Sequence, residues 1–69
     1  MRPCDKIIVM TFDLADKMIV LSDQGDAVRD DDGCGILYGV IRDAAFKIKK
    51  LAEAEKTAHI EKGLWNENE

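Results

Sequence analysis

The chain has 69 residues, of which 46% are apolar and 35% charged, and its net charge is −4. This length allows one small domain and excludes a dinucleotide-binding unit with a substrate domain, a (β/α)8 barrel or a kinase fold. The acidic balance argues against nucleic acid as the main partner, because affinity for a duplex depends on neutralising its phosphates.

The N-terminal residues show no sign of a targeting or membrane segment. The apolar run from Ile7 to Met10 is much shorter than the hydrophobic part of a signal peptide or a membrane span. Two cysteines, Cys4 and Cys34, are too few for the disulfide framework of a small secreted domain, and they form no C-x-x-C pair. We therefore expect a cytoplasmic protein without a membrane partner, with residues 1–6 frayed.

Residues 6–28 admit two interpretations. As a helix, the segment has one stripe of apolar or small residues that repeats at steps of four and three: Ile7, Thr11, Leu14, Met18, Leu21, Gly25 and Val28. A second row, next to the first, contains Ile8, Phe12, Ala15, Ile19 and Ser22. As a β-hairpin over 6–22, the segment would be apolar on both faces, and one helix can cover only one of them. The pattern favours a helix over about 11–27, and a β-hairpin followed by one long helix is the alternative.

An acidic link, Asp30-Asp31-Asp32-Gly33, separates this segment from the next. Asp31 or Asp32 can cap a following helix, and Gly63 is suited to end it. No proline lies between them, and small or apolar positions again recur at steps of four and three, with Glu55 as the one interruption: Leu37, Ile41, Ala44, Ile48, Leu51 and Ala58. The pattern predicts a long helix over about 33–62.

Two helices with a short link form an antiparallel hairpin, an all-α single domain over 1–69 with residues 64–69 frayed. Gly25, Gly35 and Gly39 lie near the link, where their missing side chains would let the two backbones approach. One hairpin cannot bury two broad apolar stripes, so we expect a homodimer or higher oligomer, most simply a four-helix bundle. The residues expected at this interface are Leu37, Ile41, Ile48, Leu51, Phe12, Met18, Phe46 and Trp65.

The candidate chemistry gathers at the end of the hairpin away from the link. His59 is the only histidine, Glu55 precedes it by one helical turn, and the antiparallel arrangement returns Cys4 and Asp5 to the same level. Cys4, Glu55 and His59 are therefore candidate metal ligands, with Asp5 as a fourth. Neither Glu-x-x-His nor His-x-x-x-His is present, so no cofactor is assigned from motifs.

These features leave three hypotheses about function. The first is a small helical protein that acts through contacts with itself or another protein, as an adaptor or regulatory module. It would not be an enzyme, because a hairpin offers no cleft of the size that enclosed sites need. The second is a metal- or redox-linked protein that uses Cys4, Glu55 and His59, with Cys34 as a further candidate. The third is a purely structural oligomer or a subunit of a larger assembly.

The helical hairpin predicts that Cys4 and Cys34 do not form an intrachain disulfide. Helical arms place the two residues tens of ångströms apart at about 1.5 Å per residue, whereas a disulfide needs Cα atoms within about 7 Å. Mass spectrometry of unreduced peptides from the native protein should find both thiols unpaired within the chain. A Cys4–Cys34 cross-link within one chain would contradict the antiparallel arrangement.

Overall fold

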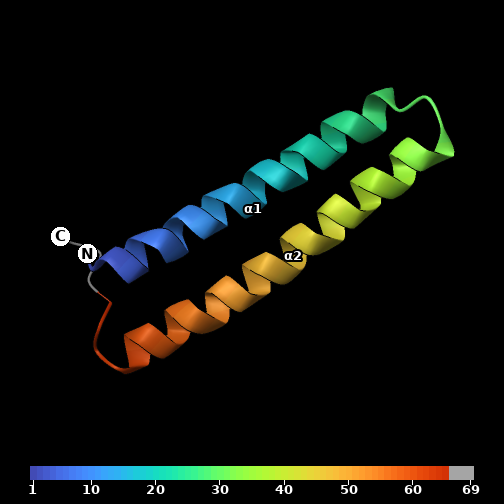
Figure 1. Cartoon of the computed structure of the whole chain (residues 1–69). Coiled ribbons are helices and arrows are strands. Elements are labelled where there is room, and N and C mark those ends of the chain that lie inside the picture. The colour runs from blue at the N-terminus through green and yellow to red at the C-terminus, as the bar shows by residue number, and fades with distance from the viewer. Residues whose placement is uncertain (66–69) are drawn as a thin grey trace.

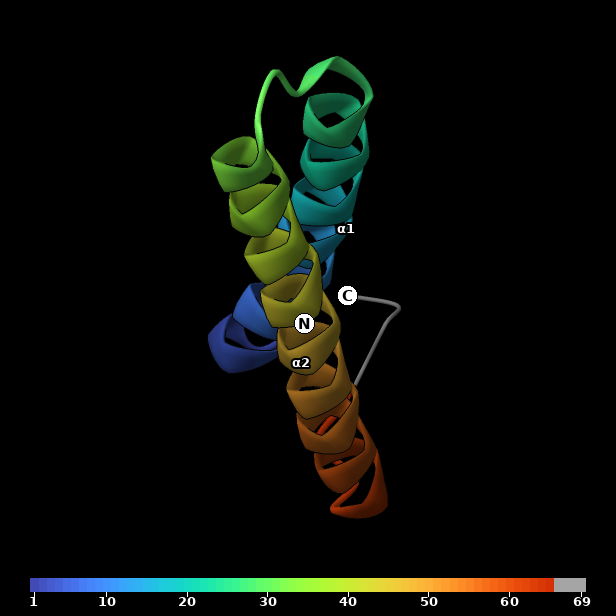
Figure 2. The same ribbon diagram turned by 90° about the vertical axis from the view of Figure 1, so that its right-hand side faces the viewer.

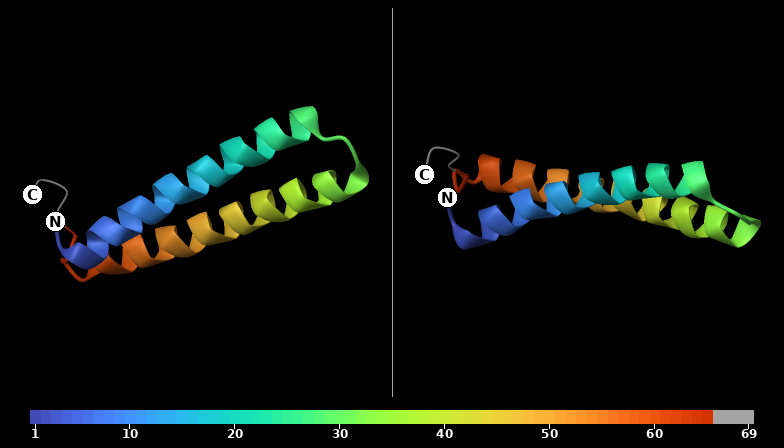
Figure 3. Two further views of the ribbon diagram at one scale, coloured as in Figure 1. Left: turned by 45° about the horizontal axis from the view of Figure 1, so that its top comes forward. Right: turned by 90° about the horizontal axis from the view of Figure 1, so that it is seen from above.

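A computed structural model describes residues 1–65 as two helices, α1 (Pro3–Val28) and α2 (Asp32–Glu61). The helices are 26 and 30 residues long, run antiparallel side by side, and are joined by residues 29–31 (Figure 1). They cross near their middles when the hairpin is seen from above (Figure 3, right). The all-α helical hairpin is thus confirmed, and no strand occurs within residues 1–65, so the β-hairpin alternative over 6–22 is wrong.

Helix α1 begins at Pro3 and not near residue 11, so the expected N-terminal boundary is wrong. Proline suits the first position of a helix because the N–H it lacks would have no intrahelical partner there. Asp5 adds a negative charge in the first turn, which the helix dipole favours. Residues 3–6, which we expected to be frayed, are the first turn of the helix. The β-branched residues that follow disfavour helix only slightly, and packing against α2 outweighs that preference.

The link is short and extended, and it ends in a helix cap. The Asp31 carboxylate accepts a hydrogen bond from the backbone N–H of Cys34 at 2.8 Å. This bond holds the pKa of Asp31 below its usual value, because it favours the charged form of the carboxylate. The expected cap is confirmed at Asp31, and α2 covers Asp32–Glu61 where about 33–62 was expected.

Helix α2 ends in a glycine motif. Gly63 has a φ of 73°, and its N–H donates to the carbonyl of Ile60 at 2.9 Å. The N–H of Leu64 donates to the carbonyl of His59 at 2.9 Å, which completes a Schellman motif. Trp65 then lies with its ring 5.2 Å from the Lys56 ammonium. The expected fraying of residues 66–69 concerns positions outside the described residues.

The two helices meet along a seam of small residues. The buried positions of this seam are Ala15, Ser22, Gly25, Ala45 and Ala52. Two of them on each helix are seven residues apart, which is close to two helical turns, so they form a continuous row. The Ser22 hydroxyl donates to the carbonyl of Ile19 at 2.8 Å, so its burial leaves the hydroxyl hydrogen bonded. Small side chains along both rows let the helices pack closely.

On α2 the buried seam residues are shifted by one position along the chain from the predicted stripe, which includes Leu37, Leu51 and Ala58. Ala45 is fully buried, whereas Leu37 and Leu51 are 53% and 59% exposed. On α1 the buried residues Ala15 and Ser22 belong to the second predicted row, and Gly25 belongs to the first. The larger apolar residues are therefore left beside the seam and not within it.

Only one of the three glycines near the link makes a close packing contact with the other helix. A Cβ on Gly25 would lie 2.5 Å from the ring of Tyr38, so the missing side chain makes room for that ring. At Gly35 the neighbour is the side chain of Arg29, and at Gly39 nothing lies within 4 Å. The packing of the Tyr38 ring on Gly25, and not contact between glycine backbones, thus explains why a glycine occupies position 25.

This difference predicts opposite effects of alanine at two helical glycines. Gly25→Ala should lower the free energy of unfolding by about 1–3 kcal/mol, because the new methyl group overlaps the Tyr38 ring. Gly39→Ala should raise it by about 0.5–1 kcal/mol, because alanine favours helix and meets open space there. Thermal or urea unfolding followed by circular dichroism measures both. Equal changes in the free energy of unfolding for the two variants would contradict the packing of Tyr38 on Gly25.

Candidate functional site

The hairpin has two broad faces of different character. When two antiparallel helices pack against each other, the residues that come one position before the seam residues lie on one broad side of the hairpin in both helices. On α1 this row is Ile7, Leu14, Leu21 and Val28, and on α2 it is Leu37, Ala44, Leu51 and Ala58. Both rows are apolar throughout.

We name this surface the apolar face; it contains the two rows together with Met10 and Val40. Its large side chains are half exposed or more, from 52% at Leu21 to 75% at Val28. Other large exposed apolar side chains lie elsewhere on the two helices: Val9, Val20, Ile36, Phe46 and Ile60.

Two open hollows of about 340 and 240 Å³ adjoin on the apolar face. The first lies on α1 and is lined by Ile7, Met10, Thr11, Leu14 and Lys17. The second lies between the helices and is lined by Ile8, Thr11, Ile48, Leu51, Ala52 and Glu55. Thr11 lines both, which places the α1 row and the α2 row on one continuous surface.

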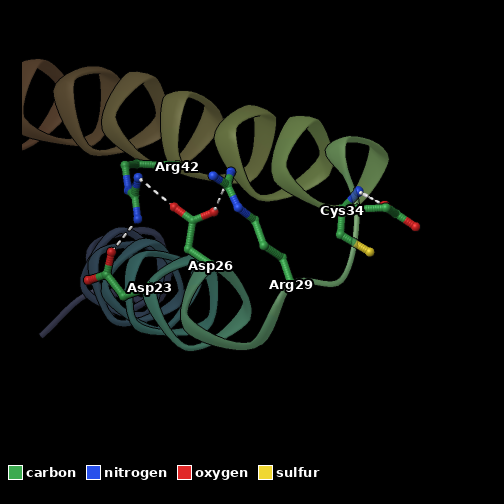
Figure 4. Close-up of polar contacts among 6 residues, drawn as sticks. Asp23, Asp26, Arg29, Cys34 and Arg42 are labelled. Atoms are coloured by element: carbon green, nitrogen blue, oxygen red, sulfur yellow. Dashed lines mark hydrogen bonds and ion pairs between the residues drawn. The ribbon is translucent and has the colours of Figure 1, made fainter.

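The opposite face carries ion pairs between the helices. Asp16 and Asp23 follow the seam residues of α1, and Lys49 Nζ lies 2.9 Å from Asp16. Arg42 pairs with Asp23 and lies 3.5 Å from Asp26, near the link (Figure 4). The side chains in these pairs are 33–63% exposed, so solvent screens each pair and it stabilises the fold little. Because they join α1 to α2, they still favour this pairing of the helices over others.

A polar cluster occupies the end of the hairpin where α1 begins and α2 ends. His59 Nδ1 lies 2.5 Å from Asp5 Oδ1, and the Asp5 side chain is fully buried while that of His59 is 13% exposed. The Cys4 thiol completes the group, since ligand atoms of Cys4, Asp5 and His59 all lie within 4.8 Å of one another. Among residues 1–65 no hydrogen-bond partner reaches Asp5 Oδ2, although this oxygen is buried.

The other predicted ligands lie farther from this cluster. Glu55 Oε2 is 3.9 Å from His59 Nε2, on the other side of the imidazole, and the Glu55 side chain is 68% exposed. Cys34 lies beside the link, at the opposite end of the hairpin (Figures 1 and 4). The structure therefore joins Cys4, Asp5 and His59, leaves Glu55 at the edge and separates Cys34 from the group.

The residues predicted for a dimer interface lie at several depths. Leu37 and Leu51 are on the apolar face, and Phe46 is exposed away from it. The remaining five are partly buried: Phe12, Met18, Ile41, Ile48 and Trp65. The α1 row was not predicted to be an exposed surface, although its seven-residue spacing is visible in the sequence. The full burial of Asp5 was not predicted either.

No protein-family model matches the chain, and neither a curated protein nor a solved structure does. No helix of the described part is long and apolar enough to cross a membrane. The apolar face and the polar cluster are the two features from which a function can be proposed.

Removing the partner of the buried carboxylate should destabilise the hairpin. We expect His59→Ala to lower the free energy of unfolding by about 1–3 kcal/mol, because Asp5 would stay buried without a hydrogen bond. Lys49→Ala removes an exposed ion pair and should cost less than about 1 kcal/mol. Urea unfolding in a buffer with a chelator compares the two variants. A larger decrease in the free energy of unfolding for Lys49→Ala than for His59→Ala would contradict the stabilising role of the Asp5–His59 pair.

Proposed function

We propose that the chain is a self-associating helical module that acts through protein–protein contact, two copies packing their apolar faces into a four-helix bundle. The observation that carries this proposal is the pair of apolar rows exposed on one face. Monomeric proteins seldom leave a large contiguous apolar surface in water, and such a surface is typical of interaction sites.

The core of a single hairpin is too small to account for a stable fold. The buried hydrophobic residues of the described part are three alanines, at positions 15, 45 and 52. Burying a large apolar side chain contributes about 1.5–3 kcal/mol, and almost none of the large side chains is buried in one copy. Chains of this size need an added source of stability, and association of the apolar faces supplies it.

The area of the apolar face suits a dimer. The Cα extents of the hairpin are 48 Å along the helices and 18 Å across, which corresponds to a projected area of about 860 Å². A stable interface buries about 800 Å² on each partner. One whole face of the hairpin therefore provides the area that a stable dimer requires.

The chemistry of the two rows favours a second copy as the occupant. The α2 row alternates large and small residues, Leu37, Ala44, Leu51 and Ala58, whereas the α1 row is large throughout. Alternating sizes across an interface let side chains interdigitate, and a two-fold dimer presents both rows of each copy to the other. Asp16, Asp23 and Asp26 pair with Lys49 or Arg42 on the opposite face, so these three carboxylates lie away from the contact.

Two matched substitutions on α1 test this proposal. Leu14 and Val20 are 55% and 54% exposed, but Val20 lies about a third of a turn away, off the apolar face. Leu14→Glu occurs twice in a dimer, so it should raise the dissociation constant at least about a hundredfold. Val20→Glu should leave the dimer intact. Sedimentation velocity across a concentration series measures both.

Melting temperature provides a second readout. Because folding is coupled to association, the melting temperature of the unmodified protein and of Val20→Glu should rise with protein concentration. That of Leu14→Glu should be low throughout. A monomer at tens of micromolar with a concentration-independent melt would refute the proposal, as would equal loss of dimer in the two variants.

A further inference from the structure

We call the end of the hairpin where α1 begins and α2 ends the open end. We infer that it binds one divalent transition-metal ion per chain, with Zn²⁺ as the best fit, through Cys4, Asp5 and His59. This inference does not rest on the proposed self-association. The site consists of residues from the first turn of α1 and the last turn of α2. The number of metal ions bound per chain tests the inference directly.

The donor set identifies the class of ion. A thiolate and an imidazole are the ligands that Zn²⁺, Co²⁺ and similar ions prefer, whereas Mg²⁺ and Ca²⁺ take oxygen ligands alone. Cys4, His59 and Asp5 offer one sulfur, one nitrogen and one oxygen within 4.8 Å of one another. Three protein ligands leave the fourth position of a tetrahedral ion to water or to a donor from another molecule.

The buried carboxylate provides an independent reason for a cation here. The Asp5 side chain is fully buried, and no donor in residues 1–65 reaches its Oδ2 atom. Buried polar atoms are nearly always hydrogen bonded, and buried charges are paired or coordinate a metal. His59 satisfies only the other oxygen, at 2.5 Å. A divalent ion beside Asp5 would satisfy the remaining one.

The distances require only small movements on binding. Ligand atoms around tetrahedral Zn²⁺ lie about 3.3–3.8 Å apart, given bonds of about 2.0–2.3 Å. The widest separation in the cluster is up to 4.8 Å and must shorten, while His59 Nδ1 and Asp5 Oδ1 must separate from 2.5 Å. Cys4 is exposed and in no disulfide, so rotation about χ1 can bring its sulfur inward. On binding, the ion replaces the hydrogen bond between His59 and Asp5. The Nδ1 proton goes to solvent from an imidazolium or moves to Nε2 of a neutral ring, so a neutral imidazole with an Nε2–H binds the ion in either case, and the thiol proton goes to solvent.

Glu55 would act as a positioning residue. A histidine that binds metal through one ring nitrogen usually donates its other N–H to a carboxylate or carbonyl, which fixes its tautomer. Glu55 Oε2 lies 3.9 Å from His59 Nε2, so a small side-chain movement brings it within hydrogen-bond distance. Glu55 thus orients His59 and is not itself assigned as a ligand.

The test uses untagged full-length protein, stripped of metal with a chelator. Isothermal titration with Zn²⁺ should give one ion per chain, and Co²⁺ should produce the ultraviolet charge-transfer absorption of a Co²⁺–thiolate bond. Cys4→Ser should remove this absorption and weaken Zn²⁺ binding at least tenfold. Because Cys4 is exposed, circular dichroism of the variant should still show the helices.

Cys34→Ser is the matched control, since Cys34 is the second thiol and lies at the other end of the hairpin. It should keep the stoichiometry, the affinity and the absorption. Asp5→Asn should weaken Zn²⁺ binding at least tenfold, and Glu55→Gln should weaken it about 10–100-fold while keeping the Co²⁺–thiolate absorption. Absence of binding to the unmodified protein, binding unchanged by Cys4→Ser, or binding lost in Cys34→Ser would each overturn the assignment.

Discussion

Close packing of small residues between the two helices is the constraint on which the rest of the structure depends. Ala15 and Ser22 of α1 lie against the surface of α2 that carries Ala45 and Ala52, and all four side chains are buried. At these positions the close approach of the helices leaves no room for leucine or isoleucine. The large apolar side chains lie on the flanks of the seam, where some, such as Ile8 and Ile48, are partly buried and others, such as Leu14 and Leu51, are more than half exposed in a single copy.

This arrangement gives the hairpin its two different faces. Seen from the side of the link, the molecule is a single layer of two helices that cross each other (Figure 2). One side carries the cross-helix ion pairs of Lys49 and Arg42, which keep the register without needing burial. The other side carries the apolar rows and is the side that we propose a second copy covers. Folding and assembly would then depend on the same surface.

The open end is held differently from the rest of the seam. There the contact between the helices is polar, and it depends on the buried carboxylate of Asp5 and the imidazole of His59. The backbone of His59 also accepts the hydrogen bond that closes the Schellman motif, so its side chain and its carbonyl both help to end α2. An ion bound at this point would join the two chain segments that the link, at the far end, does not connect.

The sequence by itself determined the elements of this protein. Periodicity at steps of four and three predicted both helices, and local chemistry at Asp31 and Gly63 located the link and the end of α2. It could not determine which of two neighbouring rows would face inward, because a broad apolar stripe spans both and its period is the same for each. The tertiary structure decided this in favour of the smaller residues, since close approach of two helices depends on side-chain size and not on hydrophobicity alone. It also decided the burial of Asp5, because this burial depends on the contact of Asp5 with His59, 54 positions away along the chain.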